Sequence, residues 1–85
     1  MEEKEDNTNL FPGVMVTITK SDEQEGIKVG KTYIVSVIEG DEVYLQSARS
    51  TEQNYLHSDD EYRAATYPEI SVFFTERFSR AFSGE

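Results

Sequence analysis

The stretch of residues 26–45 constrains the fold more than any other part of the chain. Apolar residues fill nearly every other position in it, and an acidic break that contains Gly40 interrupts them. This pattern predicts two antiparallel strands joined by a tight turn, in which Gly40 takes a positive φ angle. In the first of these strands, residues 31–38, apolar side chains compete for both faces. That pattern predicts a bulge near Ser36 that bends the strand so that it serves both halves of a barrel.

The segments on either side of this hairpin supply the remaining elements of a small barrel. In chain order, we predict a first strand at residues 10–19, a polar loop at 20–29, a fourth strand at 53–57, a helical turn within 58–67 and a fifth strand at 70–74. Ile27 and Val29 are expected to fold back from the polar loop onto the core. Phe11 is expected to tuck under the end of the barrel.

Phenylalanines at a spacing of four residues predict a short closing helix after the last strand. The three rings are Phe74, Phe78 and Phe82, and Thr75 can cap the helix. A domain this small needs their apolar area, so we expect all three rings in the core. The predicted fold class is therefore mainly β, a five-stranded antiparallel barrel with a short C-terminal helix.

The chain of 85 residues has room for one core. Residues 1–9 hold four acids and one lysine and are expected to form a disordered acidic tail, which leaves residues 10–85 as a single domain. The absence of cysteine excludes disulfides and thiolate zinc sites and favours the cytoplasm. The apolar runs are too short for a membrane span or a signal peptide, so a soluble protein is expected.

No pattern of catalytic or metal-binding residues stands out. His57 is the only histidine, and no spacing signature supports a triad around it. The consecutive acids at residues 59–61 lack the alternate spacing and central glycine of a calcium loop, and Gly26 and Gly30 are too isolated for a phosphate-binding loop. We therefore expect a protein that is not an enzyme and that needs no cofactor and no metal.

Charge is the strongest functional signal. Seventeen acidic residues against eight basic ones give a formal charge of −9. Such a chain repels phosphate backbones and anionic membranes, so direct binding to nucleic acid or to a membrane is not expected. It is attracted to basic surfaces instead. Outside the tail, the acids concentrate in two clusters, which consist of Glu39, Asp41 and Glu42 and of Asp59, Asp60 and Glu61.

The segment VGKTYIVSVIEGDEVYL, preceded by GVMVTIT and a polar loop, resembles the small SH3-like barrels of translation, transcription and phage proteins. That resemblance implies an SH3-like barrel that binds peptides, proteins or nucleic acid through its loops. The two acidic clusters stand where nucleic-acid-binding members display basic residues. In size, acidity and lack of a catalytic motif, the chain also resembles the early host-takeover proteins of bacteriophages, several of which imitate DNA to block a host protein.

The leading hypothesis is an acidic DNA mimic that inhibits a basic DNA-binding protein of a bacterial host, in the host cytoplasm. Histone-like nucleoid proteins are the foremost candidates, because they bind DNA by charge and shape with little base reading. The predicted binding residues are the two acidic clusters together with Tyr44.

Two other interpretations stay open at this point. The clusters can be solvated loops that only keep the protein soluble. Alternatively, the chain is a non-catalytic interaction or adaptor module whose anchors are exposed tyrosines, for which the candidates are Tyr33, Tyr44, Tyr55, Tyr62 and Tyr67. Both a monomer and a homodimer paired through edge strands are compatible with the sequence.

Overall fold

The computed structural model describes residues 10–23 and 26–82, and the side chains up to residue 79. The predicted acidic tail, residues 1–9, lies outside the described residues. The elements in chain order are β1 (Met15–Lys20), β2 (Thr32–Glu39), β3 (Glu42–Gln46), β4 (Asn54–Tyr55), β5 (Glu61–Ala64) and α1 (Tyr67–Phe82). Within the described ranges, no helix has both the length and the apolar character to cross a membrane.

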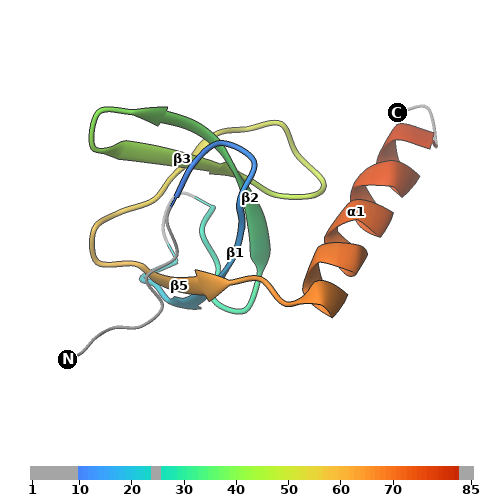
Figure 1. Cartoon of the computed structure of the whole chain (residues 1–85), viewed down its shortest axis with the longest axis horizontal. Coiled ribbons are helices and arrows are strands. Elements are labelled where there is room, and N and C mark those ends of the chain that lie inside the picture. The colour runs from blue at the N-terminus through green and yellow to red at the C-terminus, as the bar shows by residue number, and fades with distance from the viewer. Residues whose placement is uncertain (1–9, 24–25, 83–85) are drawn as a thin grey trace.

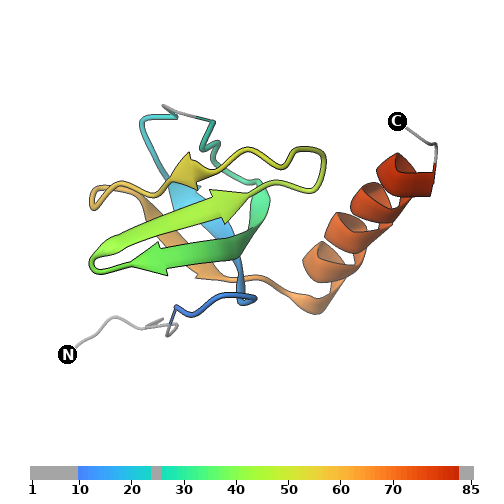
Figure 2. The same cartoon turned by 90° about the horizontal axis from the view of Figure 1, so that it is seen from above.

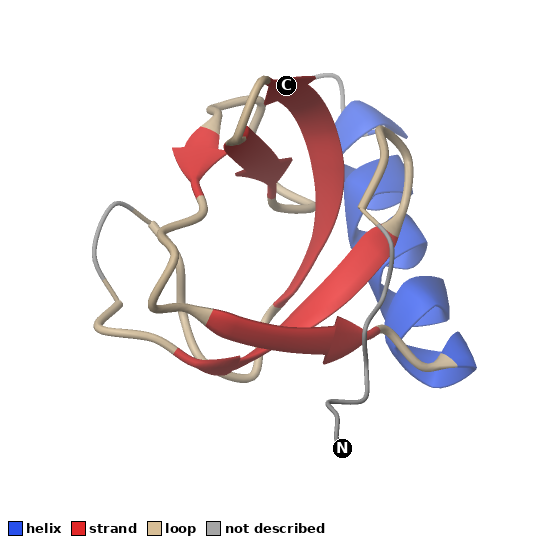
Figure 3. Ribbon diagram, turned by 60° about the vertical axis from the view of Figure 1, so that its left-hand side comes forward, coloured by secondary structure: helices blue, strands red, loops and turns tan. Residues whose placement is uncertain are grey.

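The five strands form one antiparallel sheet in the order β4-β3-β2-β1-β5. The sheet curls around an interior, and α1 lies outside it on one side (Figures 1 and 3). The two ends of the sheet order, β4 and β5, leave this barrel open. The predicted fold class, a small five-stranded antiparallel barrel with a C-terminal helix, is confirmed.

The central hairpin has the predicted bulge and turn. Val35 pairs with Leu45 and Val37 pairs with Tyr44, so Ser36 is the extra residue on β2. Gly40 occupies the turn with a φ angle of 61°. The bulge changes which side chains face inward, because Val35 before it and Ile38 after it both contact the barrel core.

The interior of the barrel is filled by residues from three strands and one loop. The completely buried members are Val16, Ile18, Ile27, Tyr33, Val35 and Leu45. The buried hydroxyl of Tyr33 donates to the carbonyl of Gly26 at 2.7 Å and accepts from the N–H of Lys28 at 3.0 Å. Burial also raises the pKa of Tyr33. This tyrosine therefore fixes the loop between β1 and β2. Ile27 is buried as predicted, whereas Val29 and Phe11 are exposed, contrary to prediction.

The prediction of a strand at residues 70–74 was wrong, because this segment belongs to α1. The fifth strand lies earlier, at Glu61–Ala64, where a helical turn was predicted. β-Branched and aromatic residues favour a strand locally, but a capping box starts a helix just before them. The N–H of Thr66 donates to Glu69 Oε1 at 2.8 Å, and the N–H of Glu69 donates to the Thr66 hydroxyl at 3.3 Å.

One face of α1 packs on the outside of the sheet. Phe73 is 2% exposed and lies in a second apolar cluster with Met15 and Ala48, against which Ile34 and Ile70 also pack. A phenylalanine does pack between the helix and the sheet, but it is Phe73 and not one of the predicted rings. Phe74 and Phe78 are 46% and 68% exposed, and the side chain of Phe82 lies outside the description.

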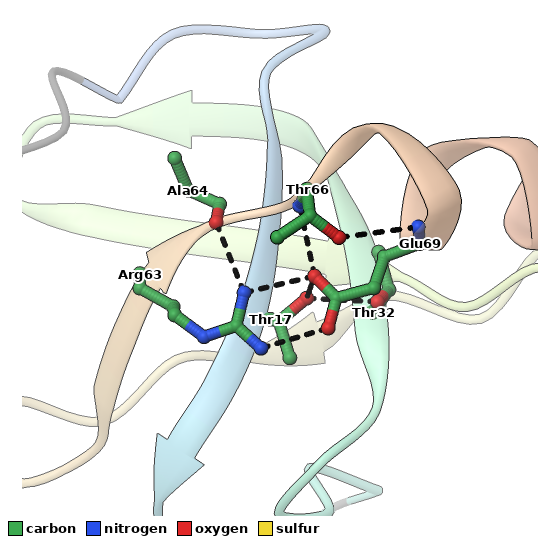
Figure 4. A network of polar contacts seen from close by, with 6 residues as sticks. All are labelled: Thr17, Thr32, Arg63, Ala64, Thr66 and Glu69. Atoms are coloured by element: carbon green, nitrogen blue, oxygen red, sulfur yellow. Dashed lines mark hydrogen bonds and ion pairs between the residues drawn. The ribbon is translucent and has the colours of Figure 1, made fainter.

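Glu69 joins the helix to the barrel (Figure 4). Its carboxylate accepts two hydrogen bonds from the Arg63 guanidinium at 2.8 and 2.7 Å, and one from the Thr17 hydroxyl at 2.9 Å. The hydroxyls of Thr17 and Thr32 are 2.8 Å apart, so the network reaches β2. Arg63 and the Thr66 N–H hold the pKa of Glu69 well below its usual range.

Arg77 makes a second attachment further along the helix. Its Nη2 donates to the Ser47 carbonyl at 3.0 Å and to Gln46 Oε1 at 3.3 Å. The guanidinium also lies 5.1 Å from the centre of the Phe73 ring. Polar contacts from β1, β5 and the end of β3 therefore hold α1 in one position on the sheet.

The first test of this packing compares two phenylalanines of the same helix. Phe73→Ala should lower the free energy of unfolding by about 3 kcal/mol or more, because it leaves a cavity between α1 and the sheet. Phe78→Ala, at an exposed position, should change it by less than about 1 kcal/mol. Urea denaturation at low protein concentration measures both values. Equal losses would contradict the described packing.

The second test uses pH. The pKa of Glu69 is depressed in the folded state, so the ionised carboxylate stabilises the fold. Its full contribution to the free energy of unfolding is present above the unfolded pKa of about 4.3 and is lost as the pH falls below that value. Glu69→Gln should therefore destabilise the protein at pH 7, by about 1–2 kcal/mol given the partial exposure of Arg63. It should also flatten the decline of stability below about pH 4.3. Denaturant titrations across this range measure the slope, and Glu76→Gln, an exposed glutamate of the same helix, should keep the wild-type slope.

Candidate functional site

The two predicted acidic clusters lie at the same end of the molecule. The first occupies the β2–β3 turn and the second occupies the turn that leads into β5. Figures 1 and 2, which differ by 90°, both place these turns at the end away from α1. Five of the six predicted acids are exposed, namely Glu39, Asp41, Glu42, Asp59 and Glu61. Exposed acids about twenty positions apart in sequence therefore lie at the same end of the molecule.

The hairpin tip holds its carboxylates on paired strands. Glu39 and Glu42 are directly opposite each other in the β2–β3 register, so their side chains share one side of the sheet. The hydroxyl of Tyr44 donates to Glu42 Oε1 at 2.8 Å. This hydrogen bond raises the pKa of Tyr44, and the negative charges of Glu42 and Glu39 act in the same direction. Tyr44 thus positions a carboxylate in addition to presenting its ring.

Asp60 has a structural role that the sequence did not reveal. It is 8% exposed, and its Oδ2 accepts a hydrogen bond from the N–H of His57 at 3.0 Å. The N–H of Asp60 donates back to the His57 carbonyl at 3.0 Å, and His57 Nδ1 lies 3.8 Å from Oδ2. Asp60 closes the turn that carries Asp59, so we leave it out of the candidate binding surface.

The remaining acids of this region differ in their surroundings. Glu61 lies opposite Lys20 in the β1–β5 register, and the lysine charge partly offsets it. Asp59 lines a small hollow of about 170 Å³ together with Asp22, from the loop between β1 and β2. The sequence did not single out Asp22, because two lysines nearly balance the three acids of that loop, and only the tertiary fold brings Asp22 to the second cluster. We define the acidic end as Asp22, Glu39, Asp41, Glu42, Asp59 and Glu61.

A row of aromatic rings runs between the two clusters. The centres of the Tyr44 and Tyr55 rings are 5.7 Å apart, and those of Tyr55 and His57 are 4.8 Å apart in an edge-to-face arrangement. Tyr44 and Tyr55 are register partners on β3 and β4. The row starts beside Glu42 and ends beside Asp60, so it joins the hairpin tip to the turn before β5.

Two other observations complete the description of the site. Among the described residues, no group of three or more histidine, aspartate and glutamate side chains is arranged to hold a metal ion. Comparison of the chain with protein-family models, curated proteins and solved structures gives no match, so its function has to be argued from the residues themselves.

Adjacent aspartates allow a test of the division between structural and surface acids. Asp60→Asn should lower the free energy of unfolding by about 1–3 kcal/mol. The amide oxygen that replaces the buried carboxylate is a weaker acceptor for the N–H of His57. Asp59→Asn, which changes an exposed neighbour in the same way, should stay within about 0.5 kcal/mol. Thermal or urea unfolding measures the two variants side by side. A larger loss in Asp59→Asn would reverse this assignment.

Proposed function

We propose that this chain is a DNA mimic, which binds the basic DNA-binding surface of another protein through its acidic end and thereby displaces DNA. The observation that supports the proposal is that the hairpin tip and the turn before β5 carry exposed carboxylates at the same end of the barrel, and that Asp22 of the loop after β1 lies beside Asp59. A surface of this kind raises the local concentration of a cationic partner and orients it.

The geometry of the tip suits this role. Glu39, Asp41 and Glu42 place three carboxylates within four consecutive residues of a hairpin. Opposed residues in an antiparallel pair are about 5 Å apart, which is of the same order as the distance between charges along DNA. Because the strands already fix the backbone, a partner orders only the side chains when it binds.

The partner class follows from what a charge array can imitate. It reproduces the phosphates of DNA but not the pattern of donors and acceptors on the base edges. Proteins that bind DNA by backbone charge and shape are therefore the best targets, and bacterial histone-like proteins belong to this class. A phage-encoded inhibitor acting in the host cytoplasm is the setting we infer for such a chain.

The adaptor hypothesis has weaker support on the barrel. Tyr33 is completely buried, and Tyr44 and Tyr55 are half-buried within the aromatic row. The most exposed tyrosine is Tyr67, at 83%, and it belongs to α1. Tyr44 and Tyr55 can still contribute to the acidic end, since aromatic faces beside carboxylates attract lysine and arginine side chains.

The experiment is a competition for a bacterial histone-like protein bound to a fluorescent DNA duplex, read by anisotropy. Wild-type protein should displace the duplex, and its apparent affinity should fall steeply between low and moderate salt. Glu39→Gln with Glu42→Gln should weaken competition by about tenfold at low salt. The matched control, Glu52→Gln with Glu76→Gln, neutralises two exposed glutamates outside the acidic end. Its apparent affinity should stay within about twofold of the wild-type value.

Charge reversal gives the stronger form of the same test. Glu39→Lys, Asp41→Lys and Glu42→Lys together should abolish competition while the far-ultraviolet circular dichroism spectrum stays unchanged. Equal loss in the control pair would show that net charge, and not this surface, is responsible. A salt-insensitive complex that is lost in Tyr44→Ala but kept in Glu39→Gln with Glu42→Gln would support the adaptor hypothesis instead.

A further inference from the structure

A small hollow lies where the turn before β5 meets the loop between β1 and β2. Its volume is about 170 Å³, and its lining consists of Asp22, Tyr55, His57, Ser58, Asp59 and Asp60. Most of this lining comes from the segment that joins β4 to β5, the two ends of the sheet order. The hollow is therefore a concave part of the acidic end, in contrast to the projecting hairpin tip.

The lining of the hollow carries negative charge without a basic side chain to offset it. Asp22 and Asp59 are exposed there, and the buried Asp60 also lines the hollow. None of the described residues in the lining is a lysine or an arginine. A recess with carboxylates on its walls concentrates negative potential, and salt screens a charge held inside it less than a charge on an open surface.

Asp60 supplies a carboxylate that the fold uses only in part. Its side chain is 4% exposed, and its Oδ2 accepts the hydrogen bond from the N–H of His57. The other oxygen, Oδ1, accepts no hydrogen bond from the part of the chain that the structure describes. Buried polar atoms nearly always have a partner, which can be a bound molecule. A buried carboxylate with an unused oxygen in the wall of a hollow indicates a ligand that donates hydrogen bonds.

Aromatic rings form another part of the wall. Tyr55 and His57 both line the hollow, and their rings meet edge to face with centres 4.8 Å apart. The face of a tyrosine ring attracts cations, and arginine more often than lysine. A guanidinium group is planar, so it stacks on a ring while its N–H groups donate to carboxylates in a fixed fork. A lysine ammonium is a compact charge without a plane to stack. Carboxylates beside an aromatic wall therefore favour a guanidinium group.

The volume restricts what the hollow can hold. A cavity of about 150 Å³ holds a benzene ring, whereas sites for drug-sized ligands have about 300–1,000 Å³. A hollow of about 170 Å³ therefore accommodates the end of one arginine side chain but not a nucleotide. A metal ion fits less well, because no group of three or more acidic or histidine side chains among the described residues is arranged to hold one.

We propose that this hollow binds the guanidinium group of an arginine side chain of the basic partner protein. The hollow belongs to the acidic end, so the identity of the protein that carries this arginine rests on the proposed function. The carboxylates of Asp22, Asp59 and Asp60 accept hydrogen bonds from the guanidinium group, and its plane lies against Tyr55.

This arrangement reproduces a second feature of DNA besides its charge. Proteins that read charge and shape insert arginine side chains into the minor groove, where phosphates flank them on both sides. A recess flanked by Asp22 and Asp59 offers an arginine similar surroundings. The projecting hairpin tip then imitates the outer phosphates, and the hollow imitates the groove.

A small arginine probe tests the site without any partner protein. N-acetylarginine amide is titrated into the isotope-labelled wild-type chain at constant ionic strength, and the amide chemical shifts are followed by NMR. The shifts should saturate with a dissociation constant of about 1–20 mM and should be largest at Asp22 and residues 55–60. N-acetyllysine amide should bind about threefold more weakly or worse. N-acetylcitrulline amide, which has nearly the same shape without the charge, should cause no saturable shift.

Three results of these titrations would overturn the proposal. The first is equal binding of the lysine and arginine probes, and the second is an equal response to magnesium chloride. Either would show a surface that attracts any cation. The third is a set of shifts concentrated at the hairpin tip, which would place the arginine site elsewhere.

Matched variants locate the site. Asp22→Asn with Asp59→Asn should weaken binding of the arginine probe by about fivefold or more, because two carboxylates leave the hollow. Asp41→Asn with Glu61→Gln removes the same charge from exposed positions that do not line the hollow, and should stay within about twofold. Both variants keep Asp60 and its turn. Equal losses would show attraction by net charge and would refute the site.

The aromatic wall has a separate test. Tyr55→Leu should abolish the preference for the arginine probe over the lysine probe, because the stacking surface is lost. Tyr44→Leu removes a ring of the same aromatic row that does not line the hollow, and should keep the preference. A preference that survives in Tyr55→Leu would contradict stacking on this ring.

A complex with a bacterial histone-like protein separates this proposal from the DNA-mimic proposal. In the complex, the amide signals of residues 55–60 should shift, and the arginine probe should no longer bind. Displacement of DNA by a chain whose hollow still binds the probe in the complex would support DNA mimicry and refute this inference. Binding of the probe by a chain that does not displace DNA would refute DNA mimicry and support the guanidinium site.

Discussion

The carboxylate of Glu69 is the point on which the arrangement of helix and barrel depends. It accepts hydrogen bonds from Arg63 on β5, from Thr17 on β1 and from the N–H of Thr66 at the start of α1. One side chain therefore caps the helix, ties the helix to an edge strand and orients a threonine of the strand next to it. Charge-assisted bonds of this kind are stronger than neutral ones, and here they converge on one group. This attachment directs α1 as it leaves the sheet, and the packing of Phe73 together with the hydrogen bonds of Arg77 determines which face of the helix is exposed.

The same attachment separates two surfaces of opposite character. With Glu69 engaged, Phe73 faces the sheet, and Phe74 and Phe78 are left on the outward side. At the far end of the barrel, the β2 bulge and the Gly40 turn set the direction of the hairpin that carries three of the exposed carboxylates. Charge is thus concentrated at one end and aromatic surface at the other. The surface proposed to bind a basic protein therefore lies apart from the helix.

The sequence allowed the barrel to be predicted better than the helix. Alternation and turn residues mark strands directly, which is why the hairpin, its Ser36 bulge and Gly40 were correct. Residues 70–74 were misassigned because their β-branched and aromatic side chains favour a strand, whereas the capping box of Thr66 and Glu69 and the packing of Phe73 stabilise a helix. The four-residue spacing of the phenylalanines identified a helical face, but spacing alone does not say which face meets the sheet. That choice depends on contacts with Met15 and Ala48, which are distant in sequence.

The same limit applies to the acidic surface, and it bears on how the proposed function should be understood. Runs of carboxylates could be located from the sequence, but a run says nothing about which member the fold uses internally. Asp60 closes its own turn, whereas Asp22 joins the surface from a loop in which two lysines nearly balance three acids. What a cationic protein would meet is therefore a set of fixed positions and not a total charge. Strand pairing at the hairpin and the hydrogen bonds that close the Asp60 turn hold the backbones of both turns, and this order supports the proposal that their carboxylates imitate phosphates.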